Sequence, residues 1–294
     1  MNIQFIDRST GEIITETPPA EGLLKFIYDN PIGKLTLMPL VKRKFVSAWY
    51  GRKMDRPSST SKIAGFVKSL KIDMNESVRT IDEFTSFNDF FYRHLKPDAR
   101  PIGEGFVSPG DGKLIAFESI EEVNDFFVKG QKFTIKDFLQ NNQLADQYKD
   151  GSMLILRLAP NDYHRFHFPL AGTPSAMRMI KGGLLSVSPY ALVKNFTRVF
   201  TENKRSLVGL QTKEHGQVIL APVGATMVGS ILATYTPNHP IKKGDEMGYF
   251  AFGGSTIVIL TEKGKVKIDD DIIKHTRNGQ ETFVKMGEKI GALL

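Results

Sequence analysis

The sequence of 294 residues contains no cysteine. A chain without cysteine cannot form a disulfide, use a thiolate nucleophile or bind zinc through sulfur. Long apolar runs are also missing, because no window reaches the roughly 18 residues that a transmembrane helix needs. The first residues, MNIQFIDRSTGEIITE, lack the basic start and the apolar stretch of a signal peptide. We therefore expect the protein to stay on the cytoplasmic side of whatever membrane it meets.

Positive charge is concentrated in one part of the chain. The formal net charge is +7, and residues 21–71 hold eleven Lys/Arg against three Asp/Glu. Apolar residues at helical spacing lie between the basic ones, and Pro31, Pro39 and Pro57 divide the segment into short helices. Such helices either pack on the core with solvated basic faces or bind an anionic membrane surface. Nucleic acid is the less favoured partner, because no nucleic-acid-binding module is present.

The periodicity of apolar residues changes along the chain. Residues 2–6 and 12–15 predict a small hairpin, residues 20–95 predict short helices, and the rest alternates as β-strands do. The predicted strands are Leu114–Phe117, Phe126–Lys129, Met153–Leu158, Ser206–Gln211, Val218–Ala221, Ile231–Tyr235, Met247–Phe252 and Thr256–Thr261, with helices at Ile135–Gln140 and Pro189–Phe196. The predicted fold class is α+β, with a β-rich barrel- or sandwich-like catalytic core after an N-terminal amphipathic helical region.

The first segment that could take part in chemistry is Ser108-Pro-Gly-Asp-Gly112. An aspartate between glycines usually makes a turn, because its side chain bonds the nearby backbone and glycine tolerates positive φ. The segment is not a phosphate-binding P-loop, since Leu114 follows Lys113 where a Ser or Thr is required. Asp111 alone is therefore compatible with turn chemistry.

The second segment, Pro160-Asn-Asp-Tyr-His-Arg-Phe-His-Phe-Pro169, contains His164 and His167 three residues apart. Two histidines at this spacing could ligate a metal, but no third ligand is near them in sequence. We therefore expect no metal site. Histidines flanked by aromatic residues after an apolar strand fit general acid–base work better.

The third segment, Phe250-Ala-Phe-Gly-Gly-Ser-Thr256, places Ser255 after two glycines and before an apolar strand. It is either a tight turn or a nucleophile, and it lacks the last glycine of the hydrolase GxSxG elbow. A small residue before serine lets the hydroxyl reach the carbonyl of its own preceding peptide bond. Attack there converts the amide to an ester, and elimination then cuts the chain and leaves dehydroalanine, which hydrolyses to a pyruvoyl group and ammonia.

The phrases SPGDG, DYHRFHFP and FGGST, in this order, resemble the phosphatidylserine decarboxylase family, in its compact bacterial-type form. The resemblance runs from the basic N-terminal segment to the C-terminus, and it includes Thr201–Arg205 and Pro222–Ile231. The family's commoner phrases are LGST and SPADG, so Gly253 replaces Leu and Gly110 replaces Ala here. Both departures spare the reacting residues. Lys204 stands where many members have Glu, and no role is transferred to it.

The resemblance implies a role for four residues. Asp111, His167 and Ser255 would form the triad that cuts the chain between Gly254 and Ser255, giving a large chain 1–254 and a small chain 255–294. Ser255 would become a covalent pyruvoyl group, which is the cofactor and forms a Schiff base with the amine of phosphatidylserine. His164 would protonate the carbon left by loss of CO₂, and the product would be phosphatidylethanolamine.

The same resemblance implies the partners and the organisation of the chain. The partners would be phosphatidylserine, an anionic membrane surface and the two chains of one precursor, with a homo-oligomer left open. The protein would lie at the periphery of the cell membrane on its cytoplasmic side. Residues 1–98 would be the membrane-association region, comprising the hairpin and the basic helices, and residues 99–294 the catalytic domain.

Two other functions compete with this one. A serine hydrolase would use the same triad on an external ester, and it would keep an intact chain with a free Ser255 hydroxyl. A non-enzymatic membrane-binding β-domain would account for the basic segment but would leave the three conserved-looking phrases without a purpose. A denaturing gel separates the first rival from self-cleavage, and an assay for decarboxylation of phosphatidylserine by the cut protein tests the second.

Overall fold

A computed structural model describes residues 3–16, 49, 51–123, 133–187, 189–225, 230–251 and 255–294. Residues 20–48 and 50 of the predicted helical region, the predicted strand Phe126–Lys129 and residues 252–254 of the third segment lie outside the described residues. In the part of the chain that the structure describes, no helix is both long enough and apolar enough to cross a membrane.

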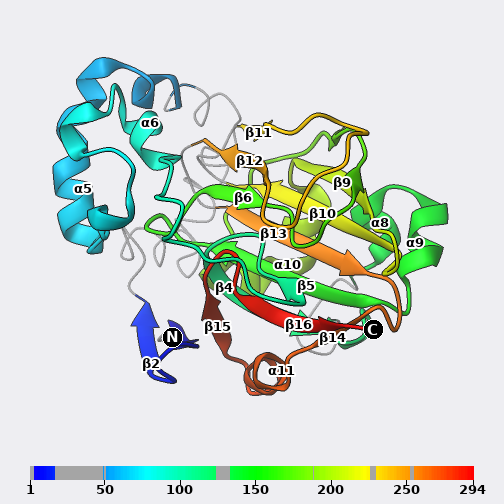
Figure 1. The fold of residues 1–294 in the computed structure, drawn as a ribbon. Coiled ribbons are helices and arrows are strands. Elements are labelled where there is room, and N and C mark those ends of the chain that lie inside the picture. Colours follow the sequence, from blue (N-terminus) through cyan, green and yellow to red (C-terminus); the bar gives the residue numbers. More distant parts are fainter. Residues whose placement is uncertain are drawn as a thin grey trace.

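A ten-stranded sheet forms the centre of the molecule (Figure 1). Its strands follow the order β2 (Ile13–Glu16), β1 (Ile3–Asp7), β15 (Glu281–Val284), β4 (Gly112–Phe117), β5 (Ser152–Leu158), β13 (Ser255–Thr261), β10 (Gln217–Gly224), β9 (Arg205–Gln211) and β7 (Thr173–Pro174), and β8 (Arg178–Ile180) also pairs with β9. All neighbours are antiparallel except β1 and β15, which are parallel. The N-terminal hairpin therefore extends the edge of the sheet.

The two faces of this sheet are covered by different layers. Leu114, Leu156 and Ile257 point to one face, where they share a core with Phe166 and Phe250 of a three-stranded sheet. That sheet has the order β11 (Ile231–Ala233), β12 (Glu246–Phe250) and β6 (Arg165–His167), and a second small sheet has the order β14 (Val266–Ile268), β16 (Lys289–Leu293) and β3 (Phe106–Val107). Because both faces are covered, β4, β5 and β13 are buried along their whole length.

Helices cover the other face. The alternate residues Ile115, Ile155 and Val258 form a core with Phe138 and Phe196 from helices. The helices are α8 (Ile135–Leu139), α9 (Asn142–Tyr148) and α10 (Pro189–Glu202), and α10 lies behind the large sheet in Figure 1. A further helix, α11 (Asp270–Arg277), packs against β4 and β15.

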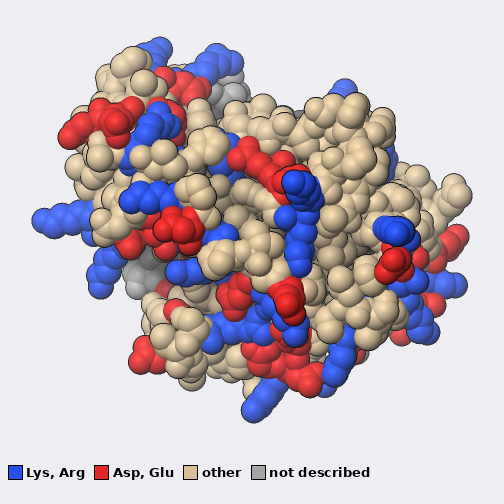
Figure 2. Space-filling view, in the orientation of Figure 1, with Lys and Arg blue, Asp and Glu red and all other residues tan. Residues whose placement is uncertain are grey.

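A small helical region lies to one side of the sheets, blue to cyan in Figure 1. It contains a helical turn at residues 51–54, then η1 (Pro57–Lys62), α5 (Ile63–Leu70), η2 (Met74–Glu76), η3 (Ile81–Glu83) and α6 (Phe87–Phe91). Its own core consists of Met54, Ile63, Phe84, Phe87, Phe90 and Phe91. Acidic and basic side chains are interspersed over this region in Figure 2, so the visible face is not uniformly basic.

The predicted α+β class is confirmed, but closure into a barrel is wrong for the described residues. The sheet is open, because its edge strands β2 and β7 lie at opposite ends of the strand order. Helices occupy the face that closure would have to bury, which explains the open form. The predicted hairpin, the strands at Met153–Leu158 and Thr256–Thr261 and the helix at Ile135–Gln140 are confirmed to within a residue or two.

Candidate active site

Ser255 is the first residue of β13, in the middle of the large sheet. It pairs with Leu158 at the end of β5 on one side and with Gly224 at the end of β10 on the other. Its side chain is fully buried, and its Oγ has no hydrogen-bond partner among the residues that the structure describes. The buried hydroxyls of Ser206, Thr256 and Thr261 are likewise without a described partner, so Ser255 is distinguished from them by its place directly after Gly253 and Gly254.

The loop that follows β5 is fixed by Asp162. Its Oδ2 accepts a hydrogen bond from the Ala159 amide at 2.7 Å, and both of its oxygens bind Lys113 Nζ, at 3.0 and 2.9 Å. Asp162 and Lys113 are each only 3% exposed at their side chains. Burial raises the pKa of Asp162, and the charge of Lys113 opposes that rise. The ion pair therefore holds the short connection between Leu158, the neighbour of Ser255, and the two histidines.

His164 follows this loop and is fully buried. Its Nδ1 lies 2.9 Å from the backbone oxygen of Asp162, and a carbonyl can only accept, so Nδ1 carries a proton and Nε2 is the nitrogen that can take up or give a second one. The ring packs against Phe91 of α6 with a centroid separation of 3.9 Å. The backbone oxygen of His164 accepts from the amide of Phe250, five residues before Ser255. His164 thus lies beside the strand that leads into the predicted cleavage segment.

His167 ends β6 and is held by two backbone contacts. Its amide donates to the Pro109 oxygen at 2.7 Å, and its Nδ1 donates to the Gly244 oxygen at 2.9 Å. The Tyr163 hydroxyl lies 3.3 Å from Nε2, which is the atom with the lone pair. Burial lowers the pKa of His167, while the bond to Gly244 and the charges of nearby carboxylates, Asp111 among them, partly oppose that shift. A neutral imidazole with an accepting Nε2 is suited to serve as a general base.

Asp111 stands just before β4 and is buried. Its carboxylate accepts from Arg100 Nε at 2.9 Å and Nη2 at 2.6 Å, and from the Met286 amide at 2.8 Å. No hydrogen bond joins Asp111 to His167 among the described residues. The orienting contact on His167 Nδ1, which the triad prediction assigns to Asp111, is made by the Gly244 carbonyl.

The three predicted segments nevertheless lie against one another. A Cβ at Gly110 would lie 3.5 Å from Leu156 Cδ2, 3.7 Å from the Arg165 oxygen and 3.8 Å from Ile257 Cδ1. The turn before Asp111 therefore touches β5, β6 and β13, the strands that position the other site residues. Gly254 lies outside the described residues, so the cleaved bond itself has no described geometry.

Sequence reasoning left several residues of this site without a role. Asp162 and Tyr163 stand inside the second segment, and Lys113 directly follows the first, so their positions in the motifs were a usable signal. Phe91 and Arg100 come from the helical region and the linker after it, where nothing in the sequence pattern connects them to the histidines or to Asp111.

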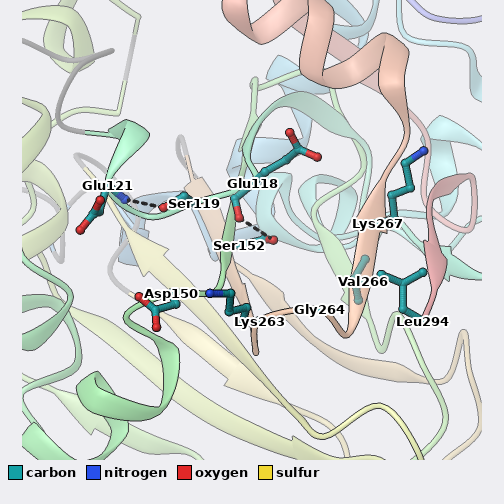
Figure 3. Close-up of a pocket in the computed structure, with 10 residues that line it drawn as sticks. All are labelled: Glu118, Ser119, Glu121, Asp150, Ser152, Lys263, Gly264, Val266, Lys267 and Leu294. Carbon is teal, nitrogen blue, oxygen red and sulfur yellow. Dashed lines mark hydrogen bonds between the residues drawn. The ribbon is translucent and has the colours of Figure 1, made fainter.

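A separate pocket of about 480 Å³ opens at the other end of the sheet (Figure 3). Its lining includes Ser152, the first residue of β5, whereas Ser255 pairs with the last residue of that strand. The lining side chains are mostly charged and of both signs, and they include no histidine. The Ser152 hydroxyl donates to the Glu118 backbone oxygen, so it is engaged in local structure. This pocket is not part of the site around Ser255.

The groups that this part of the fold offers for chemistry are a buried serine at the start of a central strand and two buried imidazoles, each with Nδ1 bound to a backbone oxygen. A serine and imidazoles of this kind are the groups of serine nucleophile chemistry. Comparison with known proteins narrows this class. The sequence model of the family described as phosphatidylserine decarboxylase matches residues 87–292.

Curated relatives match over nearly their whole length. A phosphatidylserine decarboxylase proenzyme of Fusobacterium nucleatum is 53% identical over 98% of this chain and 97% of its own. Proteins of the same name from Desulfitobacterium hafniense (strain Y51) and Chlamydia caviae are 43% and 42% identical, over 98% and 99% of this chain and 98% of their own. The chain belongs to the phosphatidylserine decarboxylase family.

Proposed function

We propose that this protein converts phosphatidylserine to phosphatidylethanolamine and CO₂ after cutting its own chain between Gly254 and Ser255. The observation that carries the proposal is the burial of Ser255 at the start of β13, with an Oγ that has no partner among the described residues. This hydroxyl is adjacent to the peptide bond that it would attack. The relatives are named as proenzymes, which fits a chain that is made inactive and then processed.

The proposed self-cleavage begins when Ser255 Oγ attacks the Gly254 carbonyl carbon and His167 Nε2 accepts the hydroxyl proton. His167 Nδ1 stays bound to the Gly244 oxygen throughout, so Nε2 remains the proton-accepting atom. The negative charge of Asp111 stabilises the imidazolium, because that charge favours the protonated ring. The Gly254 C–N bond then breaks as the Ser255 nitrogen takes the proton from His167, which leaves an ester. Loss of the Ser255 α-proton breaks the Cβ–O bond and releases the chain 1–254 with a terminal carboxylate. Water hydrolyses the resulting dehydroalanine to ammonia and a pyruvoyl group at position 255.

The site fits such a group, because elimination turns the Ser255 Cβ into a methyl group, and a methyl group in this fully buried position needs no hydrogen-bond partner. The keto oxygen, which comes from water, takes the place of the Ser255 nitrogen on Cα. A pyruvoyl group supplies a carbonyl that binds the substrate amine and accepts the electrons released with CO₂. His164 would hold a proton at Nε2 for the carbon that loses CO₂. Its Nδ1–H bond to the Asp162 oxygen and its contact with Phe91 keep that nitrogen in one orientation.

The membrane role rests on the helical region. Trp49 is 54% exposed, with Lys53 Nζ 5.5 Å from its ring centroid, and an exposed Trp beside a Lys is typical of a membrane interface. We therefore propose peripheral association with the cytoplasmic face of the cell membrane, with residues 1–98 contacting lipid and residues 99–294 catalysing the reaction. Replacing the cluster Lys42, Arg43 and Lys44 by Gln should weaken binding to anionic vesicles without changing self-cleavage. Unchanged vesicle binding would assign that cluster to a solvated face.

The two rival functions account for less of the site. A serine hydrolase would keep an intact chain, whereas the relatives are named as proenzymes of a decarboxylase. A non-enzymatic membrane-binding domain gives no purpose to the conjunction of Asp111, the two buried histidines and the buried Ser255.

Ser255→Ala tests the proposal directly. Without the hydroxyl there is no nucleophile, so the variant should run as one uncut chain on a denaturing gel and release no CO₂ from phosphatidylserine. The parent protein should show two chains and release CO₂. A parent chain that stays intact and hydrolyses esters would support the hydrolase instead, and a cut parent without decarboxylation would remove the proposed substrate.

A further inference from the structure

Arg100 lies in the linker between the helical region and the catalytic sheets, and its side chain is buried. Its Nε and Nη2 donate to Asp111, the latter at 2.6 Å, and Nη2 also donates to Glu76 Oε2 at 2.8 Å. Its Nη1 donates to the Ala99 oxygen at 2.6 Å. All three guanidinium nitrogens are therefore engaged, and one side chain joins the helical region to the carboxylate of the site.

The orientation of Asp111 depends on this contact. On one side the carboxylate receives the Arg100 fork, and on the other Oδ1 receives the Met286 amide at 2.8 Å. His167 makes no hydrogen bond to it among the described residues, because its ring is held by Gly244 and faces Tyr163. Asp111 stands two residues after Pro109, whose oxygen accepts the His167 amide at 2.7 Å, so the carboxylate belongs to the turn that holds His167. From there Asp111 acts on His167 through its charge, in the same direction as the carboxylate of Glu246, and the effect depends on where the Asp111 carboxylate is held.

We propose that Arg100 is a positioning residue for self-cleavage, which fixes the Asp111 carboxylate where its charge stabilises protonated His167. Glu76 in turn fixes Arg100 and ties the site to the helical region. The inference rests on the proposed self-cleavage. It adds Arg100, which lies outside the three segments that resemble the family, to the residues that self-cleavage requires.

The chain offers a matched control for this role. Arg79 makes the same kind of fork with Asp89, at 2.9 and 2.6 Å, but that pair lies within the helical region and has no contact with Asp111. Replacing Arg79 by Gln thus removes an ion pair of the same bidentate geometry without touching Asp111, although its side chains are 35% and 18% exposed against 7% and 5% for Arg100 and Asp111. Thermal unfolding of both variants is therefore needed to separate lost stability from lost positioning. If an Arg100 variant loses function only because an ion pair is lost, the Arg79 variant should lose it as well.

The experiment follows the rate of chain cleavage in freshly translated precursor on a denaturing gel, with thermal unfolding measured alongside. Arg100→Gln should cut on the order of 10² times more slowly than the parent, the scale expected when a catalytic group is misplaced by about 1 Å. Arg100→Lys keeps the positive charge but cannot make the bidentate hydrogen bonds to Asp111, and its cleavage rate should lie between those of Arg100→Gln and the parent. Glu76→Gln should slow cleavage less than Arg100→Gln, and Arg79→Gln should cut at the parental rate.

Combination with Asp111→Asn decides whether Arg100 acts through the carboxylate. In that background Arg100→Gln should add no further slowing, because the group that it positions is gone. Once cut, the Arg100→Gln protein should release CO₂ at the parental rate per pyruvoyl group. Parental cleavage by Arg100→Gln, additive slowing with Asp111→Asn, or equal slowing by Arg79→Gln would each overturn the inference. Normal cleavage by Asp111→Asn itself would instead count against the proposed self-cleavage triad.

Discussion

Asp162→Asn removes the carboxylate that neutralises Lys113 beside the active-site loop. Both side chains are 3% exposed, so the ammonium would stay buried without its counter-charge. The asparagine oxygen can still accept the Ala159 amide, and the loss is therefore mainly electrostatic. Breaking a buried ion pair by removing one partner costs about 3–5 kcal/mol. At ~2–4 °C per kcal/mol for a large domain, the melting temperature should fall by roughly 6–20 °C.

The measurement should be made in the Ser255→Ala background, so that every variant is one uncut chain. Lys113→Met should cost less, because burial raises the pKa of Asp162 and the lone carboxyl can take up a proton. The double variant should recover part of the loss, with a coupling free energy of about 1–3 kcal/mol from thermal unfolding.

The exposed pair Arg198–Glu202 serves as the control for this cycle, since its side chains are 42% and 47% exposed. Replacing Glu202 by Gln should change stability by less than about 0.5 kcal/mol. If Asp162→Asn were as mild as that control, or if the two changes at Asp162 and Lys113 were additive, the buried pair would not hold the loop as described.

Three further predictions concern catalysis and the turn at Asp111. Burial lowers the pKa of His167 below the ordinary value of about 6.5, so its Nε2 stays unprotonated at pH 6.5. The cleavage rate should therefore fall only at lower pH. A pH–rate profile with its midpoint at or above 6.5 would contradict this. His164→Ala should still be cut, but it should release CO₂ about 10²-fold more slowly, and full activity would leave His164 without a catalytic role. Gly112→Ala would place a Cβ 2.7 Å from the Arg157 oxygen and should destabilise the fold by about 1–3 kcal/mol. Gly110→Ala has no contact closer than 3.5 Å, so its thermal unfolding and cleavage should match the parent.

The lowered pKa of His167 also makes the stability of the fold depend on pH, and stability should fall at low pH as the cleavage rate does. A histidine whose pKa is lowered by folding binds fewer protons in the folded chain than in the unfolded one once the pH drops below 6.5. Its contribution to stability is therefore complete above that pH and is lost as the pH falls toward the folded-state pKa. Thermal unfolding of Ser255→Ala at a series of pH values measures this loss, and His167→Gln should reduce it.

The central strands could be predicted because their sequences are continuous apolar runs. Residues 153–158 are apolar except for Arg157, and residues 256–261 are mostly β-branched, so both runs have the length and composition of a buried strand. The strand at Arg165–His167 was not predicted, since three residues are too few to show a period. The same reason applies to Phe106–Val107 and Val266–Ile268.

The site residues could be predicted from their motifs, but the hydrogen bonds that connect them could not. Ser255 and the two histidines could be selected from the sequence by their residue types and their neighbours. The contact of His167 with the Gly244 oxygen spans 77 residues, and it involves a backbone atom that any residue would supply. The Arg100–Asp111 fork is local in sequence, but it follows from the path of the linker, which has no periodicity to indicate it.

The central claim is that the chain cuts itself between Gly254 and Ser255, and intact mass spectrometry of the purified protein tests it most directly. Self-cleavage gives two masses in place of one of 32.9 kDa, namely a chain ending at Gly254 and a chain of residues 255–294. The smaller chain should begin with a pyruvoyl group, so that it is lighter than the unmodified peptide by the loss of ammonia and resists Edman degradation. A single mass for the whole chain with an unmodified serine at position 255, in protein that decarboxylates phosphatidylserine, would contradict the account.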